Sequence, residues 1–88
     1  MSRRQVAAYV GAKYCLALAS GGAAMACALR ALQVQPGDPV LSNAFTLAPV
    51  PGAIASVGAR PVFVEDTEDL TIDLAHLEAQ AKASGAKV

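Results

Sequence analysis

Apolar residues along the chain change between helical and strand-like spacing. In the first third, apolar positions on one face predict a short helix from Arg3 to Val10. The stretch from Tyr14 to Ala19 is apolar without polar alternation, so we expect a strand covered on both faces, as in a parallel sheet. A helix is expected from Ala23 to Leu32, where apolar residues recur at i, i+4 and i+7 with one charged residue among them.

The rest of the chain repeats this strand-helix order. After a Pro-Gly turn, Val40 to Asn43 predicts a short strand, and the following helix continues through Ile54 to Val57 before stopping at Gly58. Arg60 to Glu65 predicts a third strand, and Lys87-Val88 begins what should be another. Alternation of this kind is typical of an α/β fold with a parallel sheet, here a helix, three strand-helix units and a truncated fourth strand.

The last predicted helix runs from Leu74 to Ser84, with Asp73 as its N-terminal cap and Gly85 as its stop. Its helical spacing separates an inward face from a solvated one. We expect Leu74, Leu77 and Ala81 to face inward, and His76, Glu78, Gln80 and Lys82 to face water. Glu78 stands four residues before Lys82, which favours an exposed ion pair.

Composition limits what 88 residues of this kind can do alone. The chain is 55% apolar but has no Trp, two Phe and two Tyr, so alanine supplies much of its apolar content and buries little area. We therefore expect a piece of a larger protein. Seven acidic and seven basic residues cancel, which gives no electrostatic case for nucleic acid or for an anionic membrane.

The two cysteines and the first residues bear on location. Cys15 and Cys27 fit neither a zinc spacing nor a redox pair, so we interpret them as small core residues in a reducing, cytoplasmic compartment. A less favoured alternative is an exported protein, because Arg3-Arg4 resembles a twin-arginine start and Ala24-Met25-Ala26 before Cys27 resembles a cleavage site. The uncharged run between Lys13 and Arg30 is too short and too rich in alanine to favour a membrane span.

The stretch Ser20-Gly21-Gly22-Ala23 is the strongest candidate for binding chemistry. It joins the predicted first strand to a helix, and the first amides of a helix have no intrahelical acceptor. Two glycines there let the backbone approach an anion closely, which favours a phosphate site. A tight strand-to-helix turn without a ligand is an equally good interpretation. The pattern is neither a Rossmann fingerprint nor a P-loop.

No other residues form a convincing catalytic or metal site. The acidic run Glu65, Asp66, Glu68 and Asp69 has no imidazole or thiolate close in sequence, and we interpret it as a solvated loop. His76 is expected to be an exposed bystander. None of the lysines lies at a strand end that would face the candidate pocket, so the chain alone offers no Schiff-base former.

Six motifs nevertheless stand in a recognisable order. They are Gly11-Ala12-Lys13-Tyr14, Ser20-Gly21-Gly22-Ala23-Ala24, Ala31-Leu32-Gln33-Val34-Gln35-Pro36-Gly37-Asp38, Asn43-Ala44-Phe45-Thr46, Gly58-Ala59-Arg60-Pro61-Val62-Phe63-Val64, and Ile72-Asp73 with Leu77-Glu78. In this order and spacing the chain resembles the DegT/DnrJ/StrS family of sugar aminotransferases, which are fold-type I enzymes that use pyridoxal 5′-phosphate. The likeness covers nearly all of the chain but only the N-terminal part of the family's large domain.

The resemblance implies roles for matching positions. Ser20, Gly21, Gly22 and Ala23 correspond to the family's Ser-Gly-Thr-Ala segment, which binds the cofactor phosphate through backbone amides and the Thr hydroxyl; here Gly22 replaces Thr and the amides of Gly22 and Ala23 remain. Leu47 stands where the family places an aromatic residue that stacks on the pyridine ring. The family's pyridine-pairing aspartate and its cofactor-binding lysine are expected beyond Val88, so transamination by these residues alone is not expected.

The resemblance also implies a larger fold and its partners. The parent enzyme is expected to be a homodimer that moves an amino group from an amino acid to a keto-sugar carried on a nucleotide. In its three-layer sheet the first strand lies at the far edge from the second and third, with later strands between them. We therefore expect an isolated chain that is marginal or partly molten, with apolar strand edges that promote self-association. The alternative is a non-catalytic truncated product or a scaffold domain.

Overall fold

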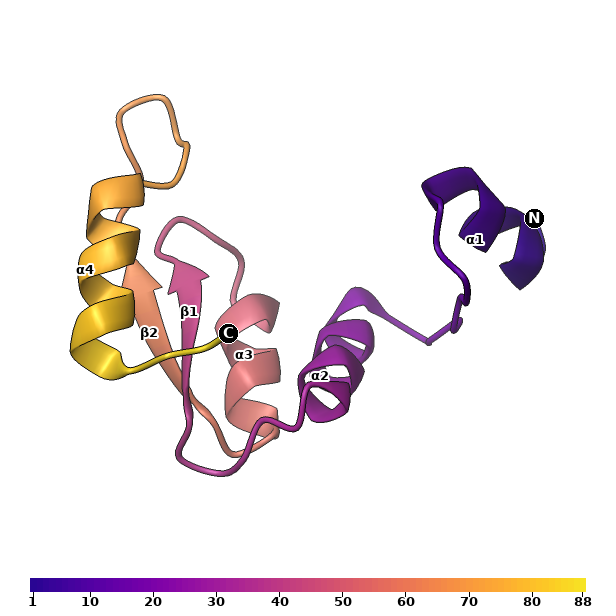
Figure 1. Ribbon diagram of the computed structural model, residues 1–88, viewed down its shortest axis with the longest axis horizontal. Coiled ribbons are helices and arrows are strands. Elements are labelled where there is room, and N and C mark those ends of the chain that lie inside the picture. The colour runs from indigo at the N-terminus through magenta and orange to yellow at the C-terminus, as the bar shows by residue number, and fades with distance from the viewer.

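A computed structural model describes all residues from Met1 to Val88 (Figure 1). Four helices and two strands follow one another along the chain. In order they are α1 (Arg3–Val10), α2 (Gly21–Ala31), β1 (Pro39–Asn43), α3 (Pro49–Ser56), β2 (Arg60–Val64) and α4 (Leu74–Ser84). None of the helices has the length and apolar character needed to cross a bilayer.

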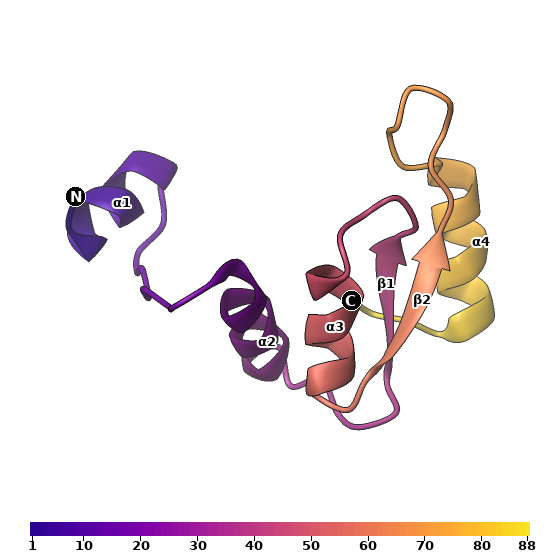
Figure 2. The same cartoon turned by 180° about the vertical axis from the view of Figure 1, so that it is seen from behind.

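The two strands form a parallel pair with helices on both sides. Pro39 is in register with Arg60 and Asn43 with Val64, so the strands pair along their whole length. Helix α3 packs on one face of this pair and α4 on the other, while α2 lies against α3 (Figures 1 and 2). Parallel strands joined through a helix confirm the predicted α/β class.

A small hydrophobic cluster holds α2, α3 and the strands together. It consists of Leu29, Val40, Ile54 and Ala59, with Val34 and Val57 packed against it. Val64 of β2 is the one large side chain that is completely buried. Nine residues of the 88 are buried, which agrees with the expectation that this alanine-rich chain builds little core.

The prediction of a strand from Tyr14 to Ala19 is wrong. This segment is extended but pairs with nothing, and it leads from α1 to α2 away from the sheet (Figures 1 and 2). Leu16 is 64% exposed and Leu18 43%. Because β1 and β2 pair with each other and lie elsewhere, the backbone groups of this segment have no neighbouring strand and are left to water.

The free edge of β1 is apolar and open. The carbonyl of Val88 accepts a hydrogen bond of 2.8 Å from the Leu41 amide, so the chain end returns to β1 on the side away from β2. A further strand was expected to begin at Lys87-Val88, but this single hydrogen bond forms there and no strand does. Beside it a hollow of about 230 Å³ is lined by hydrophobic residues alone, among them Leu29, Leu41 and Ile54. Such an edge favours pairing with another strand.

Helix α4 has the predicted bounds and cap but presents a different face. Asp73 accepts a hydrogen bond of 3.1 Å from the His76 amide, and the exposed Glu78–Lys82 pair forms at 3.0 Å. His76 and Gln80, expected in water, are half-buried, and Leu74, expected inside, is 71% exposed. Two hydrogen bonds turn this face of α4 toward β2. His76 Nδ1 accepts from the Glu65 amide at 2.9 Å, and Gln80 Nε2 donates to the Phe63 carbonyl at 3.0 Å.

Local signals also set the ends of α2. The helix begins at Gly21, two residues earlier than the sequence predicts, because Ser20 caps it. At the other end the Gln33 amide donates to the Arg30 carbonyl and the Val34 amide to the Leu29 carbonyl, which is a Schellman motif. Gln33 takes a φ of 62° there, a conformation that favours glycine.

Candidate functional site

The candidate phosphate turn is the start of α2. Ser20 is extended, with φ −157° and ψ 163°, and its Oγ accepts a hydrogen bond of 3.1 Å from the Ala23 amide. The Ser20 carbonyl accepts from the Ala24 amide at 3.0 Å, the first bond of the helix. Ser20 is therefore the N-cap that converts an extended segment into a helix at this point.

Two amides at this turn have no partner within the chain. A helix leaves its first amides without intrahelical acceptors, and Ser20 satisfies those of Ala23 and Ala24. The amides of Gly21 and Gly22 donate to no atom of the chain. The family resemblance implied the amides of Gly22 and Ala23 as phosphate donors. In the structure the two amides without a partner are those of Gly21 and Gly22, because the Ala23 amide already donates a hydrogen bond to the Ser20 hydroxyl.

The turn is open to a ligand. A Cβ added at Gly21 would meet no atom within 4 Å, and one added at Gly22 would meet only Ser20 Oγ, at 3.9 Å. The α carbons of the two glycines are therefore uncrowded. There is no acidic residue in the first turn of α2 to compete with an anion. Free amides, open space and the positive end of a helix dipole make the turn suitable for a phosphate group.

The turn also lies at the edge of the molecule where parallel sheets bind ligands. Figures 1 and 2 show that the strands run toward the same side of the molecule from which α2, α3 and α4 start. Ligands of open α/β sheets bind outside the carboxyl ends of the strands. The start of α2 therefore lies on the same side as the carboxyl ends of β1 and β2.

Leu47 lies in the loop between β1 and α3, at the same side. Leu47 is 77% exposed and Phe45 is 68% exposed, so neither side chain packs in the core. The loop is held by the last residue of β1 and by one residue that follows β2. Asn43 Nδ2 donates to the Phe45 carbonyl at 2.7 Å, and Asp66 Oδ2 accepts from the Phe45 amide at 2.9 Å. These contacts fix the loop backbone at Phe45, two residues before Leu47.

The role of Asp66 was missed by sequence reasoning. The sequence places Asp66 in a solvated acidic loop, whereas its carboxylate fixes the backbone of a loop 21 residues away. The remaining acidic residues of the run are exposed. His, Cys, Asp and Glu side chains form no group of three that could hold a metal ion. In the sequence, the Glu-Asp-Thr-Glu-Asp run from residue 65 to 69 gives no sign of the Asp66–Phe45 contact, because the contact depends on strand pairing.

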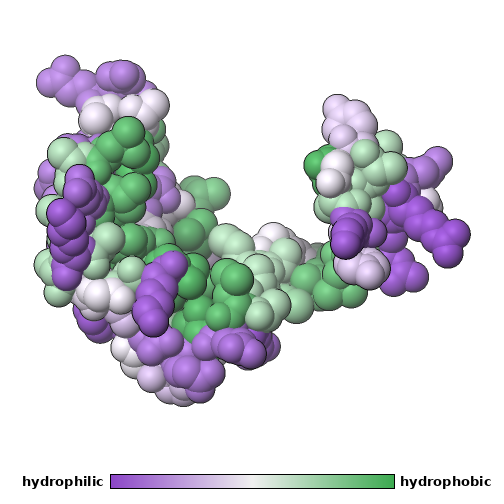
Figure 3. All heavy atoms as spheres, viewed as in Figure 1, coloured by the Kyte–Doolittle hydropathy of each residue, from purple (hydrophilic) through white to green (hydrophobic).

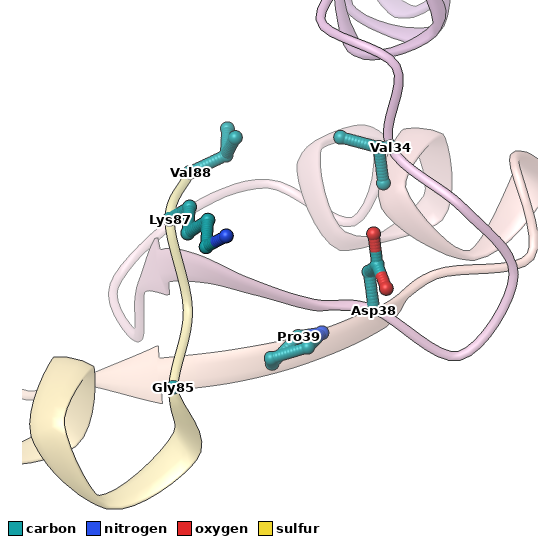
Figure 4. Close-up of a pocket in the computed structure, with 6 residues that line it drawn as sticks. All are labelled: Val34, Asp38, Pro39, Gly85, Lys87 and Val88. Atoms are coloured by element: carbon teal, nitrogen blue, oxygen red, sulfur yellow. The ribbon is translucent and has the colours of Figure 1, made fainter.

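A second hollow lies at the opposite end of β1. It has a volume of about 160 Å³ and is lined by Val34, Asp38, Pro39, Gly85, Lys87 and Val88. Figure 4 shows Lys87 and Asp38 reaching into it from different segments. Asp38 Oδ2 already accepts from the Gln35 amide at 2.9 Å, which closes the turn before β1. Because this hollow is at the start of the strand, it lies away from the ligand-binding side of the fold.

These features fit one protein family. The family model of the DegT/DnrJ/EryC1/StrS aminotransferase family matches residues 3–86, so the chain belongs to that family. The resemblance drawn from the six motifs is confirmed.

Particular relatives give the same result. The chain is 40% identical over 76 residues to the UDP-2-acetamido-2-deoxy-3-oxo-D-glucuronate aminotransferase of Pseudomonas aeruginosa, covering 85% of this chain and 21% of that protein. It is 44% identical over 75 residues to a pleiotropic regulatory protein of Geobacillus stearothermophilus, covering 84% of this chain and 20% of that protein. The chain thus spans about a fifth of the length of these relatives.

A solved structure has the same arrangement. A protein of Streptococcus pneumoniae described as a sugar aminotransferase matches with a TM-score of 0.84 and 34% identity in its apo form, over 89% of this chain and 20% of that one. Its pyridoxal phosphate form matches with a TM-score of 0.80 at 35% identity. The fold is therefore that of part of a fold-type I aminotransferase large domain, as the sequence predicted.

Proposed function

We propose that this chain supplies the cofactor-phosphate turn of a pyridoxal phosphate-dependent sugar aminotransferase. The observation that carries the proposal is the pair of free amides at Gly21 and Gly22, in open space at the start of α2. Membership of the aminotransferase family supports the reaction class, and the pyridoxal phosphate form of the S. pneumoniae protein supports the cofactor.

The residues present fit a phosphate group better than the rest of the cofactor. The Gly21 and Gly22 amides would donate hydrogen bonds to the phosphate, while Ser20 holds the first turn of α2 in place through its bond to the Ala23 amide. Leu47 is the proposed apolar contact for the cofactor ring, in a loop that Asn43 and Asp66 hold. When bound, the cofactor supplies an electron sink for transfer of the amino group.

The substrate and assembly follow from the family. We propose a keto-sugar carried on a nucleotide as amino acceptor and an amino acid as donor, since the P. aeruginosa relative is a UDP-sugar aminotransferase by name. A homodimer in the cytoplasm is proposed on the same basis. No lysine of this chain is a proposed covalent anchor, so these residues are expected to bind the phosphate without catalysing transamination.

The experiment removes one donor and leaves the helix intact. Gly21 is the first residue of α2, where proline is tolerated, and Ser20 before it is extended, as a residue before proline prefers. Gly21→Pro therefore deletes the amide proton and adds the ring carbons, without breaking a hydrogen bond of the helix. We expect this change to weaken binding of pyridoxine 5′-phosphate about tenfold or more, because a hydrogen bond to a charged group is worth roughly 1.5–3 kcal/mol.

Gly21→Ala is the matched control, because it adds a side chain and keeps the amide. Pyridoxine 5′-phosphate is used because it lacks the aldehyde that reacts with lysines elsewhere on the chain. Calorimetry should show weak saturable binding of pyridoxine 5′-phosphate by the unmodified chain and by Gly21→Ala, and loss of this binding in Gly21→Pro. Equal binding by Gly21→Pro and Gly21→Ala, or equal binding of pyridoxine without its phosphate, would contradict the proposal.

A further inference from the structure

The first fifteen residues form a hollow that the proposed function does not use. After α1 the chain turns back at Gly11, where the Ala12 amide donates to the Ala7 carbonyl at 2.9 Å. This return buries Ala7 to 5% exposure and half-buries Cys15. Between α1 and the returning segment lies a hollow of about 360 Å³, lined by Arg3, Arg4, Ala7, Lys13, Tyr14 and Cys15.

Three of the residues that line this hollow are cations without an acidic partner. Arg3, Arg4 and Lys13 form no salt bridge, since the one ion pair of the chain is Glu78–Lys82. Every acidic residue of the chain lies at Asp38 or later in the sequence. In Figure 3 hydrophilic side chains gather on the outer side of the α1 region. The hollow is therefore a concentration of positive charge on a chain whose net charge is zero.

The chemistry of these side chains selects a ligand with several anionic oxygens. A guanidinium binds two phosphate oxygens at once, and a lysine ammonium acts as a point charge beside it. Tyr14 also lines the hollow, is 87% exposed and carries a hydroxyl that can donate a hydrogen bond. A single carboxylate would engage one of the three cations. Two linked phosphoryl groups offer enough oxygens for all three.

We propose that this hollow binds a diphosphate group. The preference for a diphosphate follows from the side chains, whereas its identification with the diphosphate of a nucleotide-linked sugar rests on the proposed function. In that case α1 and the Gly11–Cys15 return hold the nucleotide end of the amino acceptor. The Ser20–Ala23 turn, which follows the extended segment, would then bind the cofactor phosphate.

Tyr14 provides the signal that tests this site. The chain has no Trp and two Tyr, so the Tyr9→Phe background leaves Tyr14 as the sole fluorophore of its kind. We expect inorganic pyrophosphate and UDP to change Tyr14 fluorescence with saturation, and inorganic phosphate to do so about tenfold more weakly. In this background Arg4→Gln or Lys13→Gln should weaken pyrophosphate at least tenfold, with unchanged far-ultraviolet dichroism.

Arg60→Gln is the matched control for charge, because Arg60 is exposed on β2 and away from the hollow. It should leave pyrophosphate binding unchanged. The proposal is overturned if Arg60→Gln weakens binding as much as Lys13→Gln, or if phosphate and pyrophosphate bind equally.

Gly21→Pro separates the two proposals. If it abolishes the Tyr14 response, the anion binds at the turn and this proposal fails while the proposed function stands. If it leaves the Tyr14 response intact and pyridoxine 5′-phosphate binding is unaffected, the proposed function fails and the diphosphate site stands.

Discussion

Replacing Gly22 by threonine should strengthen phosphate binding at the start of α2. The family's segment carries Thr at this position, and here the hydroxyl is missing while the free amides remain. There is room for the new side chain, since its Cβ would lie 3.9 Å from Ser20 Oγ, an ordinary contact distance. Gly22 is in the first turn of α2, so the hydroxyl is added beside the amides that are proposed to bind the phosphate.

The size of the effect follows from one added hydrogen bond to a charged group. Such a bond contributes roughly 1.5–3 kcal/mol, which corresponds to about 10- to 100-fold tighter binding. Calorimetric titration with pyridoxine 5′-phosphate measures the change. Gly22→Val is the matched control, because valine has the shape of threonine without the hydroxyl. If Gly22→Val and Gly22→Thr bind equally, or both bind as the parent does, the phosphate does not sit against this residue and the reasoning is refuted.

Three further changes test the packing and the backbone, each by urea unfolding. Val64→Ala should lower the free energy of unfolding by about 2 kcal/mol, because Val64 is fully buried and loses two methyl groups; a loss below ~0.5 kcal/mol would mean that β2 is not packed in this chain. Gln33→Gly should raise it by about 1 kcal/mol, since the φ of 62° suits glycine; a decrease would argue against the Schellman end of α2. His76→Ala should lower it by about 1 kcal/mol, because the Glu65 amide loses its acceptor; Glu78→Ala, which breaks an exposed ion pair, should change it by less than about 0.5 kcal/mol, and the reverse order would contradict the α4 contacts.

Elements with strong local signals were predictable from the sequence. Helix α4 has the predicted bounds because Asp73 caps its first turn and Gly85, with a φ of 73°, ends it. The strands β1 and β2 lie within a residue of the predicted ranges, since each is a short apolar run between turn residues. The start of α2 was predicted two residues late, at Ala23 instead of Gly21, because the Ser20 cap was not included.

Features that depend on distant partners were not predictable. The segment from Tyr14 to Ala19 has strand-like composition, but a strand exists only beside another strand, and apolarity alone does not say which neighbours are present. The face of α4 depended on Gln80 finding the Phe63 carbonyl, which hydrophobic spacing does not report. Which amides of the turn stay free depended on the Ser20 hydroxyl binding Ala23.

The amide signals of Gly21 and Gly22 provide the most direct test of the account. In a proton–nitrogen correlation spectrum of the whole chain, pyridoxine 5′-phosphate should move these two signals more than any others in α2, because hydrogen bonding to a phosphate shifts the donor amide. The Ala24 amide, which already donates to the Ser20 carbonyl at 3.0 Å, should move least within this turn. Pyridoxine without the phosphate should move none of them. Signals of Gly21 and Gly22 that stay in place while others shift would contradict the central claim.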